Sequence, residues 1–430
     1  MTGLPQPGAL EYLHEELDQL LAVADAELSS QYRGDGYELG PVHTAYVPAH
    51  RFEHGTVAEW GARAVAAVEE FAPDPAGLAV ATGIEAAVAA EVFPLVLAKL
   101  GRQPIEDLRI DFEDGYGVRA DDTEDAHARA AARALAAALG ADTAPPCCGI
   151  RVKSLEPPTR RRAVRTLEVF CTALLDAGRP LPSGLRITLP KVTSPAQVAA
   201  MDLVCRRLET ACGTGRGQRL QFEIQVEMPQ VVMGSDGAAT IARCVHAAPE
   251  RLAGLHFGTY DYSAALGIAA GYQSMEHPAA DYAKAVMQVA AAGTGVRLSD
   301  GSSAVLPVGG RDQVTAAWRL HARLVRRSLE RGFYQGWDLH PGQLVSRYAA
   351  TYAFYREGLG AATGRLRAHA GPAADGQEEP ATVRALAGYL LSGLTCGAFT
   401  EAEVTGQAGL SIGDLRVAAR RGILPDRDAG

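Results

Sequence analysis

Three carboxylates fall within four positions of the segment "LRIDFEDGYG": Asp111, Glu113 and Asp114, directly after alternating apolar residues. Side chains alternate between the two faces of a strand, so Asp111 and Glu113 share the face opposite to that of Ile110 and Phe112. Asp114 points away from the other two acids in this alternation. The segment therefore predicts a strand that ends in a charged face.

Charged residues end several other strand-like segments. "LQFEIQVE" alternates four apolar residues with four polar ones and ends at Glu227, and "LHFGTYD" ends at Asp261. "GIRVK" supplies Arg151, and "ITLPKV" supplies Lys191. Interior carboxylates are costly unless they pair with a cation, so carboxylates from separate strands predict a metal ion or Arg and Lys partners. Two carboxylates with water and substrate oxygens are typical of Mg²⁺, which suits a bound 2-oxo acid or enolate.

Nine short β-rich runs alternate with longer Ala-rich helical patterns, which predicts repeated βα units and a parallel sheet. The runs are 44–48, 77–81, 108–113, 149–153, 185–192, 220–227, 252–261, 304–308 and 336–341. Eight strands would close a (β/α)8 TIM barrel, and 77–81 is the weakest candidate. An open doubly wound sheet is the alternative, but the Gly-rich turn typical of its first strand is missing.

The chain divides into four expected parts. Leucines at helical spacing predict an amphipathic helix over about 9–30. The segment after 358 loses periodicity and fills with Gly, Ala and Pro, which predicts a linker. The expected parts are an N-terminal helical segment at 1–43, the barrel at 44–358, a linker at 359–381 and a C-terminal helical segment at 382–430.

Composition narrows the class of protein. The 430 residues are 47% hydrophobic and 21% charged, as in soluble enzymes. We expect a cytoplasmic protein without a membrane partner, since no apolar run has membrane-spanning length and no signal-like N-terminus is present. The seven cysteines form no C-x-x-C pair, so we expect them to be reduced. A net charge of −9 argues against nucleic acid and favours a small-molecule ligand.

Several candidate residues fall at or near the C-terminal ends of the predicted strands. They are Asp114, Lys153, Glu227, Asp261 and His340. In a βα barrel this rim carries the active site. His340 precedes a proline at a strand end, which is more typical of a structural residue. His256 and Glu223 lie inside the predicted strands, and a structural role is expected for them as well.

An ordered set of motifs resembles the citrate lyase β-subunit/HpcH–HpaI aldolase family, which is related to malate synthases. The motifs are "YVPAHRF", "IDFEDGYG", "GIRVKS", "LPKVTSPAQV", "IQVEMPQ", "FGTYDYSAALG" and "DLHPGQL", within about 44–345. The resemblance implies a Mg²⁺-dependent barrel lyase or aldolase that makes or breaks a carbon–carbon bond beside a carboxylate or acyl-CoA thioester. Its members commonly form homo-oligomers, as trimers or hexamers. Lys153 is a departure, because acyl-CoA lyases of the family usually have Asn there.

The resemblance also implies roles for single residues. Glu227 and Asp261 would bind Mg²⁺, and Arg151 would grip the carboxylate or carbonyl of a 2-oxo acid or acyl-CoA substrate. Gly258 and Thr259 would offer backbone N–H groups to a substrate carboxylate.

The acidic motif is expected beside the metal. By the same resemblance, Asp111, Glu113 and Asp114 would hold the metal's waters or the substrate. Cleavage of a 3-hydroxy acid or its thioester leaves an enolate, which the metal and Arg151 would stabilise. Glu113, a metal-bound hydroxide or a residue of a neighbouring subunit could each be the base.

Other functions stay open on the sequence alone. Lys191 could form a Schiff base in an aldolase. A malate synthase-like condensing enzyme would use the same metal site in the opposite direction. A non-catalytic barrel that binds a 2-oxo acid or acyl-CoA is the third alternative.

Overall fold

The computed structural model describes residues 13–34, 40–213, 219–370 and 379–424. Eight parallel strands form one sheet in the order β7-β6-β5-β4-β3-β2-β1-β8. The strands are β1 His43–Pro48, β2 Asp107–Asp111, β3 Cys147–Arg151, β4 Leu185–Leu189, β5 Gln221–Val226, β6 Leu252–Phe257, β7 Arg297–Ser299 and β8 Gly336–Asp338. A bridge between Ser299 and Gln335 brings the two sheet edges together. The predicted (β/α)8 barrel is confirmed as a nearly closed barrel with flanking helices.

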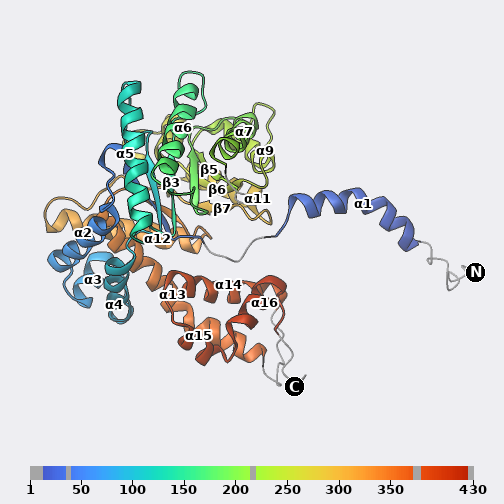
Figure 1. Ribbon diagram of the computed structural model, residues 1–430. Coiled ribbons are helices and arrows are strands. Elements are labelled where there is room, and N and C mark those ends of the chain that lie inside the picture. The colour runs from blue at the N-terminus through green and yellow to red at the C-terminus, as the bar shows by residue number, and fades with distance from the viewer. Residues whose placement is uncertain (1–12, 35–39, 214–218, 371–378, 425–430) are drawn as a thin grey trace, which may run out of the picture.

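Helices follow the strands and cover the outside of the barrel (Figure 1). Those of the barrel region are α2 Thr56–Phe71, α3 Pro75–Thr82, α4 Ala86–Arg102, α5 Asp121–Gly140, α6 Arg160–Asp176, α7 Pro195–Cys212, α8 Pro229–Val232, α9 Thr240–Ala247, α10 Thr259–Ala265, α11 Pro278–Ala291, α12 Arg311–Glu330 and α13 Pro341–His369. Two short 3₁₀ helices are η1 Ala49–Arg51 and η2 Ala270–Tyr272. Ser194 is the N-cap of α7, and its backbone N–H donates to the Gln197 side chain at 3.2 Å.

Apolar side chains of the strands face the helices. Phe222, Ile224 and Val226 of β5 are fully buried in the core, while Glu223 and Gln225 alternate with them and face the barrel interior. This arrangement confirms the alternation read from the sequence. It leaves the polar residues to converge inside the barrel and at its rim.

Two predicted strands are wrong. The run 77–81 lies in α3, because Asp74 caps a helix there by accepting a hydrogen bond of 2.7 Å from the Gly77 N–H, with Pro75 as the first helical residue. The run 304–308 is not a strand. The seventh strand is instead the three-residue β7, which is too short to show a period-2 pattern.

The expected linker at 359–381 is corrected over its first part. Helix α13 continues to His369, because Leu359, Ala362 and Leu366 on one side of it are buried. Residues 371–378 lie outside the described part of the chain. Three further helices follow, α14 Pro380–Cys396, α15 Glu401–Ala408 and α16 Ile412–Arg421, and α14 and α15 pack on α13.

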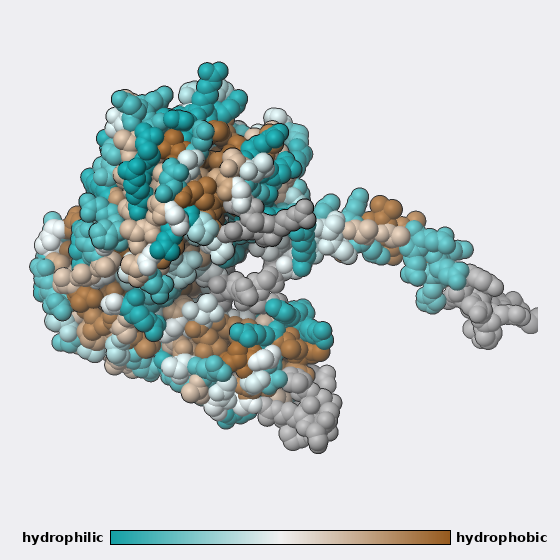
Figure 2. Space-filling view, in the orientation of Figure 1, coloured by the Kyte–Doolittle hydropathy of each residue, from teal (hydrophilic) through white to brown (hydrophobic). Residues whose placement is uncertain are grey.

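Helix α1, Leu13–Gln31, is separate from this core. None of its residues is buried, and it extends away from the barrel (Figure 1). Figure 2 shows an apolar patch on its surface, and Leu20, Val23 and Leu28 are among its exposed apolar residues.

All seven cysteines are free. Among the described helices none is long and apolar enough by itself to cross a membrane; only α3 and α4 together reach that length and hydropathy, and they are bent by 108°.

Candidate functional site

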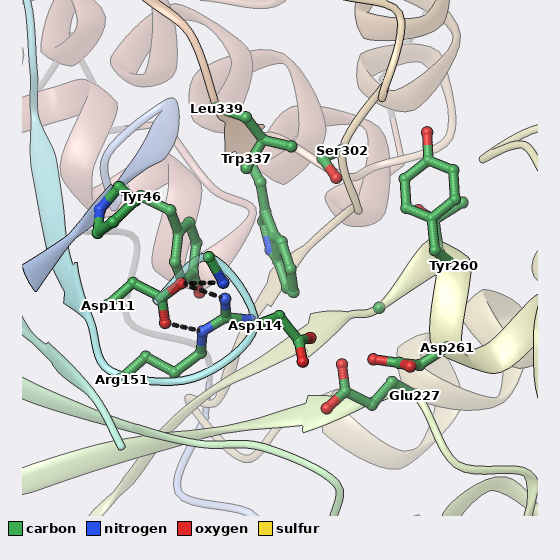
Figure 3. Close-up of a pocket in the computed structure, with 14 residues that line it drawn as sticks. Tyr46, Asp111, Asp114, Arg151, Glu227, Tyr260, Asp261, Ser302, Trp337 and Leu339 are labelled. Carbon is green, nitrogen blue, oxygen red and sulfur yellow. Dashed lines mark hydrogen bonds and ion pairs between the residues drawn. The ribbon is translucent and has the colours of Figure 1, made fainter. Parts of the chain in front are cut away.

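A cavity of about 390 Å³ opens at the C-terminal ends of the strands (Figure 3). It is lined by Tyr46, Pro48, Asp111, Asp114, Gly115, Arg151, Glu227, Gly258, Thr259, Tyr260, Asp261, Ser302, Trp337 and Leu339. These residues come from distant parts of the sequence, and the barrel brings them together at the rim where such folds carry their active sites. Seven of the eight predicted site residues line this cavity, and the eighth, Glu113, lies beside them in contact with Asp114.

Asp111 and Arg151 form one wall of the cavity. Both oxygens of Asp111 accept hydrogen bonds of 2.7 Å from the guanidinium of Arg151. Asp111 also accepts the backbone N–H groups of Glu113 (3.0 Å) and Gly115 (2.9 Å). A carboxylate with four such partners is held in one position, so Asp111 orients Arg151 and the following loop, while its catalytic role stays a prediction.

Arg151 is buried but reaches the cavity. Its guanidinium lies 4.8 Å from the centre of the Tyr46 ring, and Nη1 lies 3.3 Å from Glu113 and 3.4 Å from Gln225. The contacts of Nη1 are longer than the hydrogen bonds to Asp111. Nη1 is therefore the nitrogen of the guanidinium that could donate to a substrate oxygen.

Glu113 and Asp114 contact the same cation, the side chain of Lys191. The ammonium of Lys191 is 2.6 Å from Oε1 of Glu113 and 3.3 Å from each oxygen of Asp114. Burial, with the neighbouring charge of Asp114, raises the pKa of Glu113 to about 7. Asp114 is half-exposed and lines the same cavity as Asp111, so it does not point away from the other two acids as the strand alternation predicted.

Glu227 is buried, with 2% of its surface exposed. Its Oε1 accepts the Lys191 backbone N–H at 2.8 Å. Burial, with the charges of Glu113 and Asp261, raises the pKa of Glu227 to about 8. The positive charge of Lys191 acts against this rise, so burial is the main cause of it.

Asp261 completes the acidic side of the cavity. Figure 3 shows its carboxylate beside that of Glu227, across the cavity from Asp111 and Arg151. The same Lys191 ammonium lies 3.1 Å from Asp261. Among the described residues no group of three or more His, Cys, Asp or Glu forms a ready-made metal cage. Mg²⁺ fits a pair of carboxylates, because it keeps several waters in its shell.

Gly258 differs from its predicted role. Its N–H donates to the Val226 carbonyl (3.0 Å), so it is not available to a substrate. A Cβ at this position would lie 2.4 Å from Cβ and 2.5 Å from Oε2 of Glu227, so glycine is needed to leave space for that carboxylate. Thr259 is the first residue of α10, and its N–H has no acceptor within the helix, as its predicted role requires.

The sequence reading missed the aromatic wall of the cavity. Tyr46 and Trp337 lie with ring centres 4.9 Å apart, and Tyr260 and Ser302 line the cavity beside them. The alternation of side chains in strand β1 could have indicated Tyr46, because Tyr46 shares a face with Thr44 and Pro48.

Three other candidates lie outside the cavity lining. Lys153 turns to Glu124 (2.6 Å) and the Phe112 carbonyl. His340 caps α13 by accepting the Gly342 N–H at 3.1 Å, which makes it structural. His256 lies 3.1 Å from Glu223 inside the barrel.

A buried ion-pair layer lies in the barrel interior. Arg109, fully buried, donates to Glu223 at 2.8 and 2.9 Å and also pairs with Asp107. Glu223 is thus the structural partner that its position predicts. Arg109 was missed, although it lies two residues before Asp111 and therefore on the same strand face.

Solved structures with a similar fold include a citrate lyase from Burkholderia xenovorans LB400, with 19% identity over 86% of this chain and 96% of that chain, at a TM-score of 0.56. This likeness shows the fold. A malate synthase from Haloferax volcanii has 15% identity over 74% and 76% of the two chains, at a TM-score of 0.47. The protein CitE from Mycobacterium tuberculosis, in complex with magnesium, acetoacetate and coenzyme A, has 17% identity over 84% and 100%, at a TM-score of 0.47.

No curated protein matches the chain. The expected likeness to citrate lyases is confirmed for the fold, whereas membership of the HpcH/HpaI family stays a prediction. A family match covers residues 21–423. The chain thus belongs to the family described as "Domain of unknown function (DUF6986)".

Proposed function

We propose that this chain is a Mg²⁺-dependent carbon–carbon lyase of the aldolase kind, which acts on a small 3-hydroxy acid or its thioester. The observation that carries the proposal is the gathering of Glu113, Asp114, Glu227 and Asp261 beside a cavity whose opposite wall presents Arg151. The citrate lyase that shares the fold supports the same class of reaction.

Glu227 and Asp261 are the proposed ligands of Mg²⁺. Both line the cavity and offer only oxygen atoms, which this ion prefers. Burial, and then the charges of Glu113 and Asp261, raise the pKa of Glu227, and a bound divalent cation would favour its ionised form. When bound, Mg²⁺ supplies Lewis-acid polarisation of a substrate carbonyl.

Arg151 would contact the end of a small bound acid that lies away from Glu227 and Asp261. Asp111 fixes the guanidinium in place before substrate binds, so the group needs no reorganisation during the reaction. Its positive charge then stabilises the negative charge that develops on the substrate oxygen as the carbon–carbon bond breaks. The Thr259 N–H would donate to a carboxylate of the same ligand.

Glu113 is the proposed proton acceptor. A carboxylate with a pKa of about 7 is present in both protonation states near neutral pH, which suits transfer of the substrate's hydroxyl proton. Asp111 is excluded from this role because its two oxygens already accept four hydrogen bonds.

Thermal unfolding with and without Mg²⁺ tests the proposal. Pyruvate, oxaloacetate, glyoxylate and acetyl-CoA are added to EDTA-treated protein, and at least one oxo acid should raise the melting temperature only when Mg²⁺ is present. That ligand class is then assayed for cleavage or condensation. Equal stabilisation in EDTA, or borohydride trapping of pyruvate on Lys191, would overturn the metal mechanism. Binding without turnover would identify a binding protein instead.

A further inference from the structure

Lys191 places a positive charge at the centre of the carboxylate cluster. Its ammonium is 2.6 Å from Glu113, 3.1 Å from Asp261 and 3.3 Å from both oxygens of Asp114. These oxygens come from the loop after β2 and from α10, two segments that are far apart in the sequence. A metal ion bound to the same oxygens would therefore lie close to the positive charge of this ammonium.

The backbone of Lys191 is fixed to the same cluster. Its φ of +52° lies in the left-handed region, which side-chain-bearing residues rarely adopt. The N–H of this residue donates to Glu227 at 2.8 Å. One residue thus contacts all four carboxylates, one through its backbone and three through its side chain.

The charges of the cluster are not balanced by Lys191 alone. Four carboxylates surround one ammonium. The other nearby cation, Arg151, also lies 3.3 Å from Glu113, but its two shorter hydrogen bonds go to a fifth carboxylate, Asp111. A divalent ion brings twice the charge and attracts the same oxygens. An ammonium and a divalent ion in adjacent positions would repel each other, so the two compete.

The side chain of Lys191 has a route out of the cluster. It is 24% exposed, and its four-carbon stem is flexible. We propose that Lys191 is an internal competitor of the metal: its ammonium holds the carboxylates together when no metal is bound, and leaves them when Mg²⁺ binds. Lys191 therefore sets the metal affinity of the site. This inference rests on the proposed function for the assignment of Mg²⁺ to Glu227 and Asp261.

Isothermal titration of Mg²⁺ into the metal-free full chain tests the inference. Lys191→Met keeps an unbranched stem and removes the charge, so it should bind Mg²⁺ at least tenfold more tightly than the wild type. The same variant should have a lower melting temperature without metal, because its carboxylates lose their partner, and a larger rise on addition of Mg²⁺.

Lys99→Met is the matched control. Lys99 is a buried lysine whose ammonium lies 2.6 Å from Glu106, the residue before β2. Neither residue lines the cavity. Its replacement should lower stability and leave Mg²⁺ affinity unchanged. If Lys191→Met does not fold, Lys191→Gln removes the same charge and carries the same expectation.

The outcomes separate the inference from the proposed function. Binding to the wild type with equal or weaker binding to the Lys191 variant overturns the inference and leaves the proposed function intact. Binding to the Lys191 variant alone supports the inference in its strongest form. Absence of binding to both proteins contradicts the metal site itself and, with it, the inference.

Discussion

Asp111 and Arg151 are directly paired residues on the neighbouring strands β2 and β3, and two hydrogen bonds of 2.7 Å join their side chains. Both side chains are buried, at 2% and 7% exposure. The pair thus holds the ends of two strands and the cavity wall in one arrangement.

Replacement of Asp111 should lower the stability of the protein, because it breaks this buried ion pair. Asp111→Ala leaves a buried guanidinium without its main partner, so the free energy of unfolding should fall by about 3–5 kcal/mol. Urea unfolding measures the change. The exposed pair Glu59 and Arg63 is the control, since Glu59→Ala should change stability by less than about 0.5 kcal/mol. Equal effects of the two substitutions would contradict this prediction.

Glu227→Gln should abolish stabilisation by Mg²⁺. At a hundredfold excess over Kd the ion should add about 2.7 kcal/mol to the wild type and nothing to the variant. The variant should also melt at a higher temperature in EDTA near pH 7, because burial raises the pKa of Glu227 to about 8, so folding has to protonate this carboxyl, a cost that Gln does not have. Asp236→Asn, which changes a surface carboxylate paired with Arg243, should behave as the wild type. Retained Mg²⁺ stabilisation in Glu227→Gln would remove Glu227 from the metal site.

Gly258→Ala should disturb the site more than the fold. The added methyl group would overlap Glu227 and displace its carboxylate, so Mg²⁺ affinity and turnover should fall by at least tenfold while far-ultraviolet circular dichroism stays unchanged. Gly101→Ala is the control, because a Cβ there meets no atom within 4 Å and replaces a helical glycine of α4. It should stabilise the protein by about 0.5–1 kcal/mol. Unchanged Mg²⁺ affinity in Gly258→Ala would contradict the close approach.

The attachment of α15 should depend on pH. Burial acts to raise the pKa of Glu403, but hydrogen bonds from Arg356 and Thr400 lower it from 4.5 to about 2. A lowered pKa gives stability that is present above pH 4.5 and is lost as the pH falls towards 2. Glu403→Gln should therefore be less stable than the wild type at pH 7, and the difference should shrink below pH 4.5. Unfolding measured across this range checks it; a difference that is constant with pH would contradict the ion pair.

Removal of residues 1–31 should leave the melting temperature of the barrel unchanged. Helix α1 buries none of its residues, so its loss removes no packing from the core. Differential scanning calorimetry measures the result. The deletion keeps Tyr32, whose ring contacts His246. A fall of several degrees would show that α1 packs on another surface.

The sequence predicted the strands best where apolar and polar residues alternate over five or more positions, as in β5. It failed where a local signal was overlooked or too short: the Asp74 cap defines α3, and three residues are too few to reveal β7. The helical stretch 359–369 has a composition typical of linkers, and only its packing against neighbouring helices makes it part of α13.

The positions of the site residues followed from the same alternation, but their partners did not. Nothing in the sequence shows that Asp111 accepts four hydrogen bonds. The location of Lys191 among three carboxylates depends on a left-handed backbone in a loop, which a periodic pattern cannot encode. Tertiary geometry therefore determines which predicted acids are ligands and which are supports.

Helix α13 connects the cavity rim with the C-terminal helices. It begins one residue after His340, beside Leu339 of the cavity, and its 29 residues make a rod about 44 Å long that contacts α14 and α15 further along. The barrel and the C-terminal helices are therefore mechanically continuous. Truncation of the chain after residue 358 would cut this rod in mid-helix and remove Leu359, Ala362 and Leu366, which are buried against its neighbours.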